Sequence, residues 1–318
     1  MPIFALAPME DVTDAAFREI FGLYGKPDVM FTEFVNIDGL LHPEGFKRLK
    51  IALIKTENQK PVVAQIWGRD PQKFYEVSKT IKGLGFDGID INMGCPQDKE
   101  IKLKTCAALI REPELAQIII NSAKEGSGGL PVSVKTRIGF SGNELAQWLP
   151  ALLKAQPAVV SIHARSKKDK SKVPADWTAI EEAVRIRDNL SSKTLILGNG
   201  DIKNRAEALQ RVKDTGCDGV MIARGAFGNP WIFRKDNYQP SAEQKLWVML
   251  EHARLFDQLL GRYKPFMGMR KNFRAYASGF EGCSELRAKL LQVKNLEETE
   301  KIITEFLRDI NFKQGTVV

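Results

Sequence analysis

The sequence predicts an α/β fold: a (β/α)8 TIM barrel followed by a small all-helical C-terminal domain. Eight short runs rich in Val and Ile occur up to residue 223, and most are separated by segments with apolar residues at a helical spacing of three to four. Strands that alternate with helices in this way fit a barrel better than an open, doubly wound sheet. A Rossmann domain is disfavoured as well, because no G-x-G-x-x-G motif follows an early strand.

The predicted strands are nearly continuous in apolar residues, which is typical of parallel strands buried on both faces. They span residues 3–7, 28–33, 62–67, 88–92, 132–137, 159–163, 194–197 and 219–223. Helical spacing is clearest before the fourth and sixth strands, in two sets of residues: Phe74, Val77 and Ile81, and Leu145, Trp148, Leu149 and Leu152.

The pattern changes after Pro240. Residues 244–260 carry an apolar stripe at helical spacing, and similar stripes follow with no strand signal between them. Residues 237–241 are the expected linker, with Ser241 as the N-cap of the next helix. We therefore expect two domains, the barrel over residues 1–238 and the helical domain over residues 239–318.

Composition narrows the class of protein. Of the 318 residues, 43% are hydrophobic and 27% are charged, which excludes a disordered, collagen-like or coiled-coil chain. No apolar run reaches the ~18 residues that span a bilayer, and residues 1–8 lack the basic flank of a signal peptide. Four cysteines make no disulfide scaffold, and with three histidines they show no metal-ligand spacing. We expect a cytoplasmic monomer without a metal ion or membrane attachment.

The net charge of +8 favours a polyanionic partner such as a nucleic acid, because each neutralised phosphate releases a counterion. Three basic stretches flank the predicted mouth of the barrel, at residues 99–104, 165–172 and 262–274, and the last is interleaved with aromatic residues. We expect them to contact phosphates between the barrel and the helical domain, which positions a nucleic acid without reading its sequence. In the last stretch the expected contacts are Lys264, Arg270, Lys271 and Arg274.

Polar residues stand at the end of nearly every predicted strand, and in a barrel these ends meet at one rim. Packing alone explains such a set poorly, because each buried polar group needs a partner. The residues are Glu10, Glu33, Gln65, Asp90, Asn92, Cys95, Lys135, Arg137, His163, Arg165, Asn199, Asp201 and Arg224.

Two loops indicate a phosphate site. Residues 198–201 and 224–230 follow the seventh and eighth strands, where barrels often bind phosphate, and they supply glycines and the permanent cation of Arg224. Lys135 and His163 can add donors to an anionic or electron-rich ring. Cys95 is the strongest single candidate for a functional residue. It lies in a Gly94-Cys95-Pro96 turn directly after a strand, and such a turn can point a thiol toward the barrel mouth.

Taken in order, these motifs resemble those of the tRNA-dihydrouridine synthases, flavin enzymes that reduce selected uridines in tRNA. The resemblance covers essentially the whole chain, and Thr32-Glu33-Phe34-Val35 looks most like the bacterial C-type branch, which acts on position 16 of the D-loop. The matching elements are Ala7-Pro8-Met9, Thr32-Glu33, Gln65, Asn92-Met93-Gly94-Cys95-Pro96, Lys135-Thr136-Arg137, His163-Ala164-Arg165, Gly198-Asn199-Gly200, Ala223-Arg224-Gly225-Ala226 and Met269-Arg270-Lys271.

The resemblance implies a role for each matching residue. Cys95 is the general acid that gives a proton to C5 of the uracil while hydride passes from flavin N5 to C6, and NADPH reduces the flavin. Asn92 faces the substrate base, and Arg137 and Arg165 meet either the flavin or the RNA. The residues implied to hold FMN are Pro8, Met9, Glu10, Gln65, Lys135, His163, Asn199, Gly200, Asp201, Ala223 and Arg224.

The chain departs from the family pattern at two places. Lys104-Thr105-Cys106 replaces a glycine-rich stretch, which we expect to stiffen the loop and to bring a second thiol near Cys95, and Asn272 replaces a histidine. Two other functions remain open. One is an FMN-dependent barrel reductase of a small molecule, and the other is a non-catalytic tRNA-binding paralogue.

Overall fold

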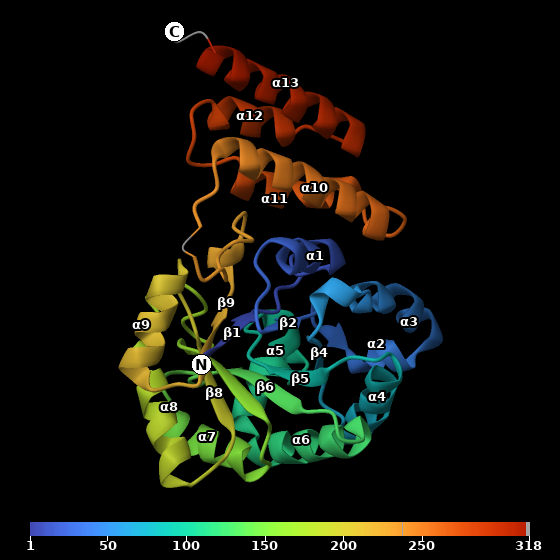
Figure 1. The fold of residues 1–318 in the computed structure, drawn as a ribbon. Coiled ribbons are helices and arrows are strands. Elements are labelled where there is room, and N and C mark those ends of the chain that lie inside the picture. Colours follow the sequence, from blue (N-terminus) through green and yellow to red (C-terminus); the bar gives the residue numbers. More distant parts are fainter. Residues whose placement is uncertain (237, 316–318) are drawn as a thin grey trace.

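The computed structural model describes residues 1–236 and 238–315. A closed barrel of parallel strands forms its first part, and this confirms the predicted fold class (Figure 1). β1 pairs with β9 on one side and β2 on the other, and β2 pairs with β4, so the sheet closes on itself. The eight strands are β1 (Ile3–Leu6), β2 (Val29–Phe31), β4 (Val62–Trp67), β5 (Gly88–Met93), β6 (Val132–Arg137), β7 (Val159–His163), β8 (Leu195–Asn199) and β9 (Gly219–Ile222).

The second strand is shorter than predicted. It ends at Phe31, and a two-residue strand, β3 (Val35–Asn36), follows after a break. β2 pairs with the beginning of β4 and β3 with its end. Within the break, the Thr32 hydroxyl accepts the backbone N–H of Gln65 at 3.0 Å, so a side chain takes the place of a backbone acceptor there.

Helices surround the barrel and bury the stripes predicted from the sequence. Phe74, Val77 and Ile81 on α4 are fully buried, and the predicted stripe of α7 is buried as well. The helices of this part are α1 (Ala15–Tyr24), α2 (Ile37–Leu41), α3 (Pro43–Leu49), α4 (Pro71–Gly83), α5 (Asp98–Lys102), α6 (Pro113–Ser127), α7 (Leu145–Lys154), α8 (Trp177–Asn189) and α9 (Arg205–Thr215), with short 3-10 turns η1 (Lys50–Leu53), η2 (Glu57–Gln59), η3 (Cys106–Arg111) and η4 (Arg224–Ala226).

Four helices and a 3-10 turn follow the barrel. Ser241 caps the first helix: its side chain accepts the Gln244 N–H and the Gln244 side chain accepts the Ser241 N–H, so the predicted N-cap is confirmed. Asn237, in the expected linker, and residues 316–318, in the expected helical domain, lie outside the described residues. The elements are α10 (Ala242–Leu260), η5 (Phe266–Met269), α11 (Arg270–Tyr276), α12 (Cys283–Leu290) and α13 (Leu296–Gly315).

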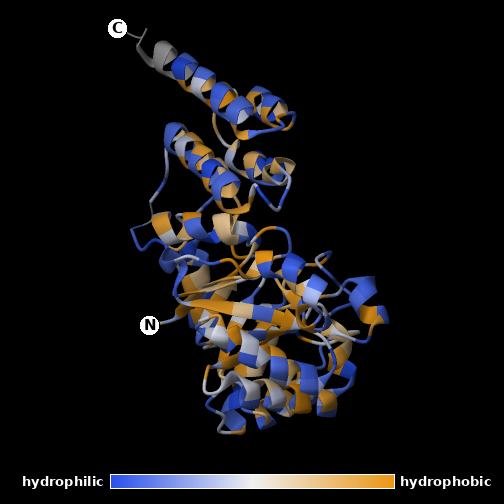
Figure 2. Cartoon of the chain, turned by 90° about the vertical axis from the view of Figure 1, so that its right-hand side faces the viewer, coloured by the Kyte–Doolittle hydropathy of each residue, from blue (hydrophilic) through white to orange (hydrophobic). Residues whose placement is uncertain are grey.

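These helices share a core with the barrel. Ala16 and Ile20 of α1 and Trp231 pack with Leu246 and Leu250 of α10, and Figure 1 shows α10 and α11 next to α1. α1 begins just after the C-terminal end of β1, and α10 packs against α1. The turn that follows α10 therefore lies close to the C-terminal ends of the first strands. In Figure 2 the strands are mostly orange, whereas many helices carry both blue and orange residues. Within the described residues, no helix has the length and apolar character needed to cross a membrane.

Candidate functional site

A cavity of about 180 Å³ opens at the C-terminal ends of β1, β6, β7, β8 and β9. Most of the residues predicted to bind a cofactor line it: Pro8, Lys135, His163, Asn199, Gly200, Asp201, Ala223 and Arg224. A larger cavity of about 610 Å³ lies at the opposite end of the strands and is lined by residues such as Pro157, Ser191 and Thr194. Part of the predicted polar rim lines the smaller cavity, which makes it the candidate functional site, whereas Gln65, Asn92 and Cys95 are not among its lining residues. The rim residues that line it are Lys135, His163, Arg165, Asn199, Asp201 and Arg224.

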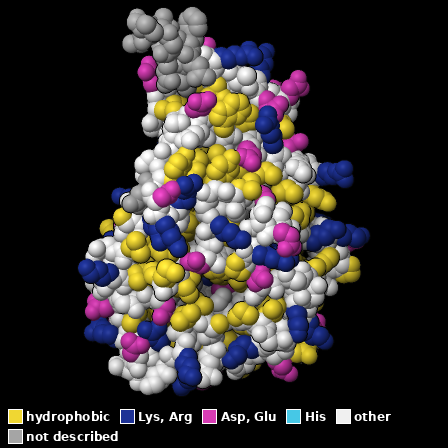
Figure 3. Space-filling model, viewed as in Figure 1, with side chains coloured by type: hydrophobic (Ala, Val, Ile, Leu, Met, Phe, Trp, Pro, Cys, Tyr) yellow, Lys and Arg dark blue, Asp and Glu magenta, His cyan; other side chains and the backbone are white. Residues whose placement is uncertain are grey.

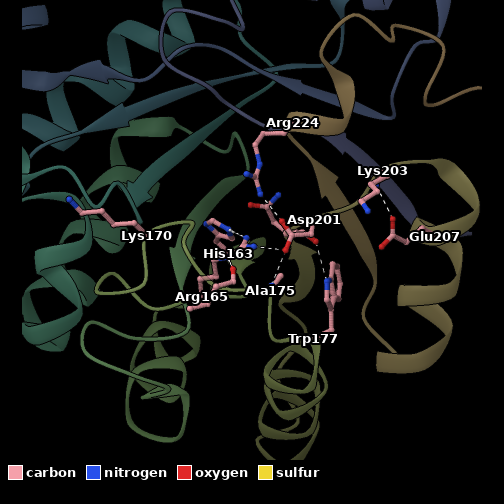
Figure 4. Close-up of polar contacts among 12 residues, drawn as sticks. His163, Arg165, Lys170, Ala175, Trp177, Asp201, Lys203, Glu207 and Arg224 are labelled. Carbon is pink, nitrogen blue, oxygen red and sulfur yellow. Dashed lines mark hydrogen bonds and ion pairs between the residues drawn. The ribbon is translucent and has the colours of Figure 1, made fainter. Parts of the chain in front are cut away.

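One carboxylate holds two guanidinium groups at this cavity. Asp201 pairs with Arg165 through Oδ2 and with Arg224 through Oδ1, at 2.6 Å from Nη2 of Arg224 (Figure 4). Arg165 is buried, whereas the Arg224 side chain is 64% exposed. The Ala175 N–H also donates to Asp201, whose left-handed backbone (φ 55°) is a strained conformation that is common at functional sites. Two fixed cations against one anion leave a positive charge suited to an anionic ligand.

His163 is neutral in this setting. Burial lowers its pKa well below the usual value, and the surrounding cations Lys135, Arg137, Arg165 and Arg224 lower it further. Its Nε2 lies 3.1 Å from Nη1 of Arg165. Since arginine can only donate, Nε2 accepts and the ring proton is on Nδ1. The ring can therefore donate one hydrogen bond from Nδ1 without adding charge.

Lys135 supplies a further cation. Its Nζ lies 3.4 Å from Oδ1 of Asn199, whose Nδ2 donates to the Met221 carbonyl at 2.7 Å. Burial, together with the nearby charge of Arg137, lowers the pKa of Lys135 to about 8, so the amine still carries its proton at neutral pH.

Cys95 follows β5 at the same end of the barrel and is half-buried. Its pKa is lowered, chiefly by a hydrogen bond with the Cys106 thiol, although burial and the carboxylates Glu10 and Glu100 oppose this. The pKa of Cys106 is raised well above its usual value by the same hydrogen bond and by burial, so Cys106 keeps its proton. The predicted second thiol therefore lies beside Cys95, and Lys104 and Cys106 hold the left-handed backbone that favours glycine (φ 54° at both).

Other predicted residues are engaged within the barrel. Gln65 is fully buried between Asp90 and Asn92, and Asn92 uses its amide oxygen to accept backbone N–H groups of the Cys95 loop (residues 94–97). Arg137 is buried, its Nε donates to the Gly94 carbonyl at 2.7 Å, and burial lowers its pKa to about 10. Arg137 therefore holds the Cys95 loop from a second side.

Two further members of the predicted cofactor set lie near the Cys95 loop and at the end of β1. Glu10 accepts a hydrogen bond from Gln97 at 3.3 Å, and burial raises its pKa. The Met9 N–H donates to the Thr13 hydroxyl at 2.9 Å. Asp90 belongs to the predicted polar rim and is fully buried, but the sequence predicted no cofactor-binding or substrate-binding role for it. Its signal was the spacing of two polar residues, Asp90 and Asn92, on one face of an otherwise apolar strand.

The cations predicted to contact RNA have different surroundings. Lys264 donates to both carboxylate oxygens of Glu33 at 3.1 Å, and Nη2 of Arg270 donates to the Val293 carbonyl at 2.9 Å. Lys271 is half-buried, with a pKa lowered by burial, and Arg274 is exposed. Lys264 thus links the helical region to the break after β2. Within the described residues, no group of three or more His, Cys, Asp or Glu side chains could hold a metal ion.

Known proteins that resemble this chain agree on its family. The profile described as "Dihydrouridine synthase (Dus)" matches residues 5–311. A "Probable tRNA-dihydrouridine synthase" of Staphylococcus aureus (strain COL) is 40% identical over 307 residues, which cover 96% of this chain and 93% of that protein. A "Probable tRNA-dihydrouridine synthase 2" of Bacillus subtilis (strain 168) is 40% identical over 309 residues, covering 96% of this chain and 94% of that protein.

A solved structure supports the fold. The structure of histamine dehydrogenase from Rhizobium sp. 4-9 matches with a TM-score of 0.54 and 13% identity, over 79% of this chain and 48% of that one. The family match confirms the prediction of an oxidoreductase, because formation of dihydrouridine is a reduction, and it supports flavin dependence. With the profile and both bacterial relatives aligned over nearly its entire length, this chain belongs to the dihydrouridine synthase family.

Proposed function

We propose that this chain is an FMN-dependent tRNA-dihydrouridine synthase that reduces the C5–C6 bond of a uridine in the D-loop of tRNA, with NADPH as the electron donor. The main support is that a cationic cavity and a half-buried thiol occupy the same end of one barrel. In this proposal residues 1–238 bind FMN and carry out catalysis, and residues 239–318 bind tRNA.

The residues at the cavity fit a flavin mononucleotide. Arg165 and Arg224 leave a positive charge for the phosphate, and Lys135 and the neutral His163 add donors beside it. A volume of about 180 Å³ is below that of a typical ligand pocket, so the cavity accommodates part of the nucleotide. When bound, the flavin supplies the hydride that C6 of the uracil takes up.

Cys95 holds the proton for C5 at its Sγ. The hydrogen bond from Cys106 stabilises the thiolate that remains after transfer, and the charges of Lys135 and Arg137 act in the same direction. Glu10 and Glu100 act in the opposite direction, which helps the thiol to recover a proton before the next turnover. The target base must leave its stack to reach this depth, as bases do in other enzymes that modify them.

The RNA is held by phosphate contacts. Among the four cations predicted to contact RNA in the helical region, Arg274 is exposed, and Lys271, one helical turn before it in α11, is half-buried. The resemblance of residues 32–35 to the C-type branch makes position 16 the expected uridine.

The first test is the purified protein. We expect bands near 370 and 450 nm and release of FMN, identified by chromatography, on denaturation. Colourless protein without flavin would favour a non-catalytic tRNA-binding paralogue. Stopped-flow reduction should be faster with NADPH than with NADH, and equal rates would contradict the proposed donor.

The second test is Cys95→Ala. Because only the proton donor is lost, the variant should bind FMN and oxidise NADPH, yet form dihydrouridine at least ~100-fold more slowly. Dihydrouridine is mapped in tRNA from a strain in which the gene for this protein is deleted and which expresses either the wild-type protein or the Cys95→Ala variant. Cys283→Ala, which removes a half-buried thiol in α12, is the matched control. Undiminished product from Cys95→Ala would remove Cys95 from the reaction, and turnover of free small molecules without any change in tRNA would favour a small-molecule reductase.

A further inference from the structure

Three polar side chains lie side by side on neighbouring strands below the Cys95 loop. Asp90 on β5 is opposite Gln65 on β4 and Ser133 on β6 in the strand register. Asp90 and Gln65 are fully buried, and Ser133 is nearly so. The proposed chemistry uses neither Asp90 nor Ser133, yet a buried carboxylate is costly unless hydrogen bonds satisfy it.

The hydrogen bonds form a chain that runs from Asp90 to the Cys95 loop. Asp90 accepts from the Ser133 hydroxyl at 2.5 Å and from Nε2 of Gln65 at 2.6 Å. Oε1 of Gln65 accepts from Nδ2 of Asn92 at 3.2 Å. Oδ1 of Asn92 then accepts the backbone N–H groups of Gly94 at 3.0 Å and Cys95 at 2.9 Å.

The groups at the two ends of this series of hydrogen bonds determine which atoms donate and which accept along it. Backbone N–H groups can only donate, so they require an oxygen from Asn92. An ionised carboxylate can only accept, so it requires the NH2 group of Gln65. Each amide has one oxygen and one nitrogen end, and a carboxylate at the far end therefore orients both of them. Burial raises the pKa of Asp90 to about 6, which leaves it ionised at neutral pH and above.

We infer that Asp90 is a positioning residue that acts through the amide relay of Gln65 and Asn92 to hold the Cys95 loop in place. The inference rests on the proposed function only in naming Cys95 as the acid. Reversal of the relay would turn the NH2 group of Asn92 toward the two backbone N–H groups and leave both without an acceptor, which is unfavourable for groups that are buried or partly buried.

Asp90→Asn tests whether the carboxylate sets the donor–acceptor direction of the relay, because asparagine keeps the size and shape of the side chain. Asparagine can donate to Oε1 of Gln65, so both directions of the relay become available. We expect the amides of Gly94 and Cys95 to exchange with deuterium at least ~10-fold faster than in the wild type, because loss of ~1.4 kcal/mol of protection has that effect. Mass spectrometry of peptides that cover residues 93–101 measures this, with peptides of β7 as the internal reference.

Two double variants should restore the polarity. In Asp90→Asn/Gln65→Glu, the new carboxylate accepts from both neighbouring amides, and Asn92 keeps its oxygen on the loop. In Asp90→Asn/Asn92→Asp, the carboxylate faces the loop directly and the relay runs in reverse with every partner satisfied. Both variants keep the wild-type charge, and both should show wild-type protection of Gly94 and Cys95.

The control is Ser161→Ala on β7. The Ser161 hydroxyl is buried and has no hydrogen-bond partner within the described residues, and its strand lies next to β6. It should leave exchange in the Cys95 loop unchanged. Unchanged exchange in Asp90→Asn, or a loose loop in either double variant, would overturn the inference. If Asp90→Asn does not fold, the two double variants still test the inference, because the inference requires both of them to fold and to protect the Cys95 loop from exchange.

These measurements need neither RNA nor turnover, so they separate this inference from the proposed function. In the reaction, Asp90→Asn should lower kcat for dihydrouridine formation and leave tRNA affinity unchanged. Weakened tRNA binding to the same degree as kcat would indicate a general structural defect instead.

Discussion

The His163 ring shows how neighbours decide the chemistry of a residue. A histidine among cations could be a general acid in another setting, but here burial and four positive side chains keep it neutral. Arg165 then fixes which ring nitrogen carries the proton. The cavity therefore holds three cations and one neutral donor, and Asp201 is the anion that keeps two of the cations in place.

The proposed phosphate site can be tested at Arg224. Arg224→Met should weaken FMN binding by ~10- to 100-fold, because a charge-assisted hydrogen bond contributes about 1.5–3 kcal/mol. Binding of riboflavin, which lacks the phosphate, should not change. Fluorescence titration of flavin-depleted protein measures both affinities, and Lys203→Met, an exposed cation nearby in Figure 4, is the control. An equal loss for FMN and riboflavin would show that Arg224 does not bind the phosphate.

At the scale of elements, α10 joins the helical region to the barrel and carries a fully buried histidine. His252 lies against the ring of Phe17 from α1, and its Nδ1 is 3.3 Å from the Tyr276 hydroxyl. Burial lowers its pKa to about 3. The charged form is therefore disfavoured in the folded protein, and burial of His252 destabilises the fold at acidic pH.

The consequence is a pH-dependent stability. The unfolded chain binds a proton at His252 near pH 6.5, whereas the folded chain binds it only near pH 3. As the pH is lowered from 6.5 to 3, the free energy of unfolding therefore falls by ~1.4 kcal/mol per pH unit. His252→Leu should remove ~2 kcal/mol of the wild-type difference between pH 7 and pH 5, measured by urea unfolding. His42→Asn, at an exposed N-cap, should keep the full difference. Identical pH dependence in wild type and His252→Leu would contradict burial of a neutral ring.

At the scale of the whole molecule, positive charge is spread widely. Figure 3 shows Lys and Arg side chains over both the barrel and the helical region, with Asp and Glu between them. The cations predicted to bind RNA differ in what they already contact. Lys264 pairs with Glu33 across the two parts of the chain, and Arg270 holds the segment after α12, whereas Arg274 is exposed.

Two neighbouring arginines should therefore separate stability from RNA binding. Arg270→Met should lower Tm, because it removes a charged donor worth ~1–2 kcal/mol. Arg274→Met should leave Tm unchanged, weaken tRNA binding and lower the slope of log Kd against log salt by ~1. Filter binding across a salt series and thermal unfolding measure the two effects. Full tRNA affinity and salt slope in Arg274→Met would place the RNA elsewhere.

Much of the barrel was predictable because its signals are local. Each strand is a short apolar run, and each covering helix repeats its buried residues every three to four positions, so Phe74, Val77 and Ile81 reveal their face without any partner. The break after Phe31 was missed because it depends on the Thr32 hydroxyl meeting Gln65 from another strand. The cavity residues were found because polar ends of parallel strands meet at one rim.

By itself the sequence determined the fold class, the position of the cationic cavity and the turn that carries Cys95, because these follow from patterns within a few neighbouring residues. Only the tertiary structure decided which charges are free. Lys264 and Glu33 are far apart in the chain yet form one ion pair, and Asp90 reaches the Cys95 loop through two amides from two strands. Hydrogen bonds and ion pairs depend on distance in space, and folding sets that distance.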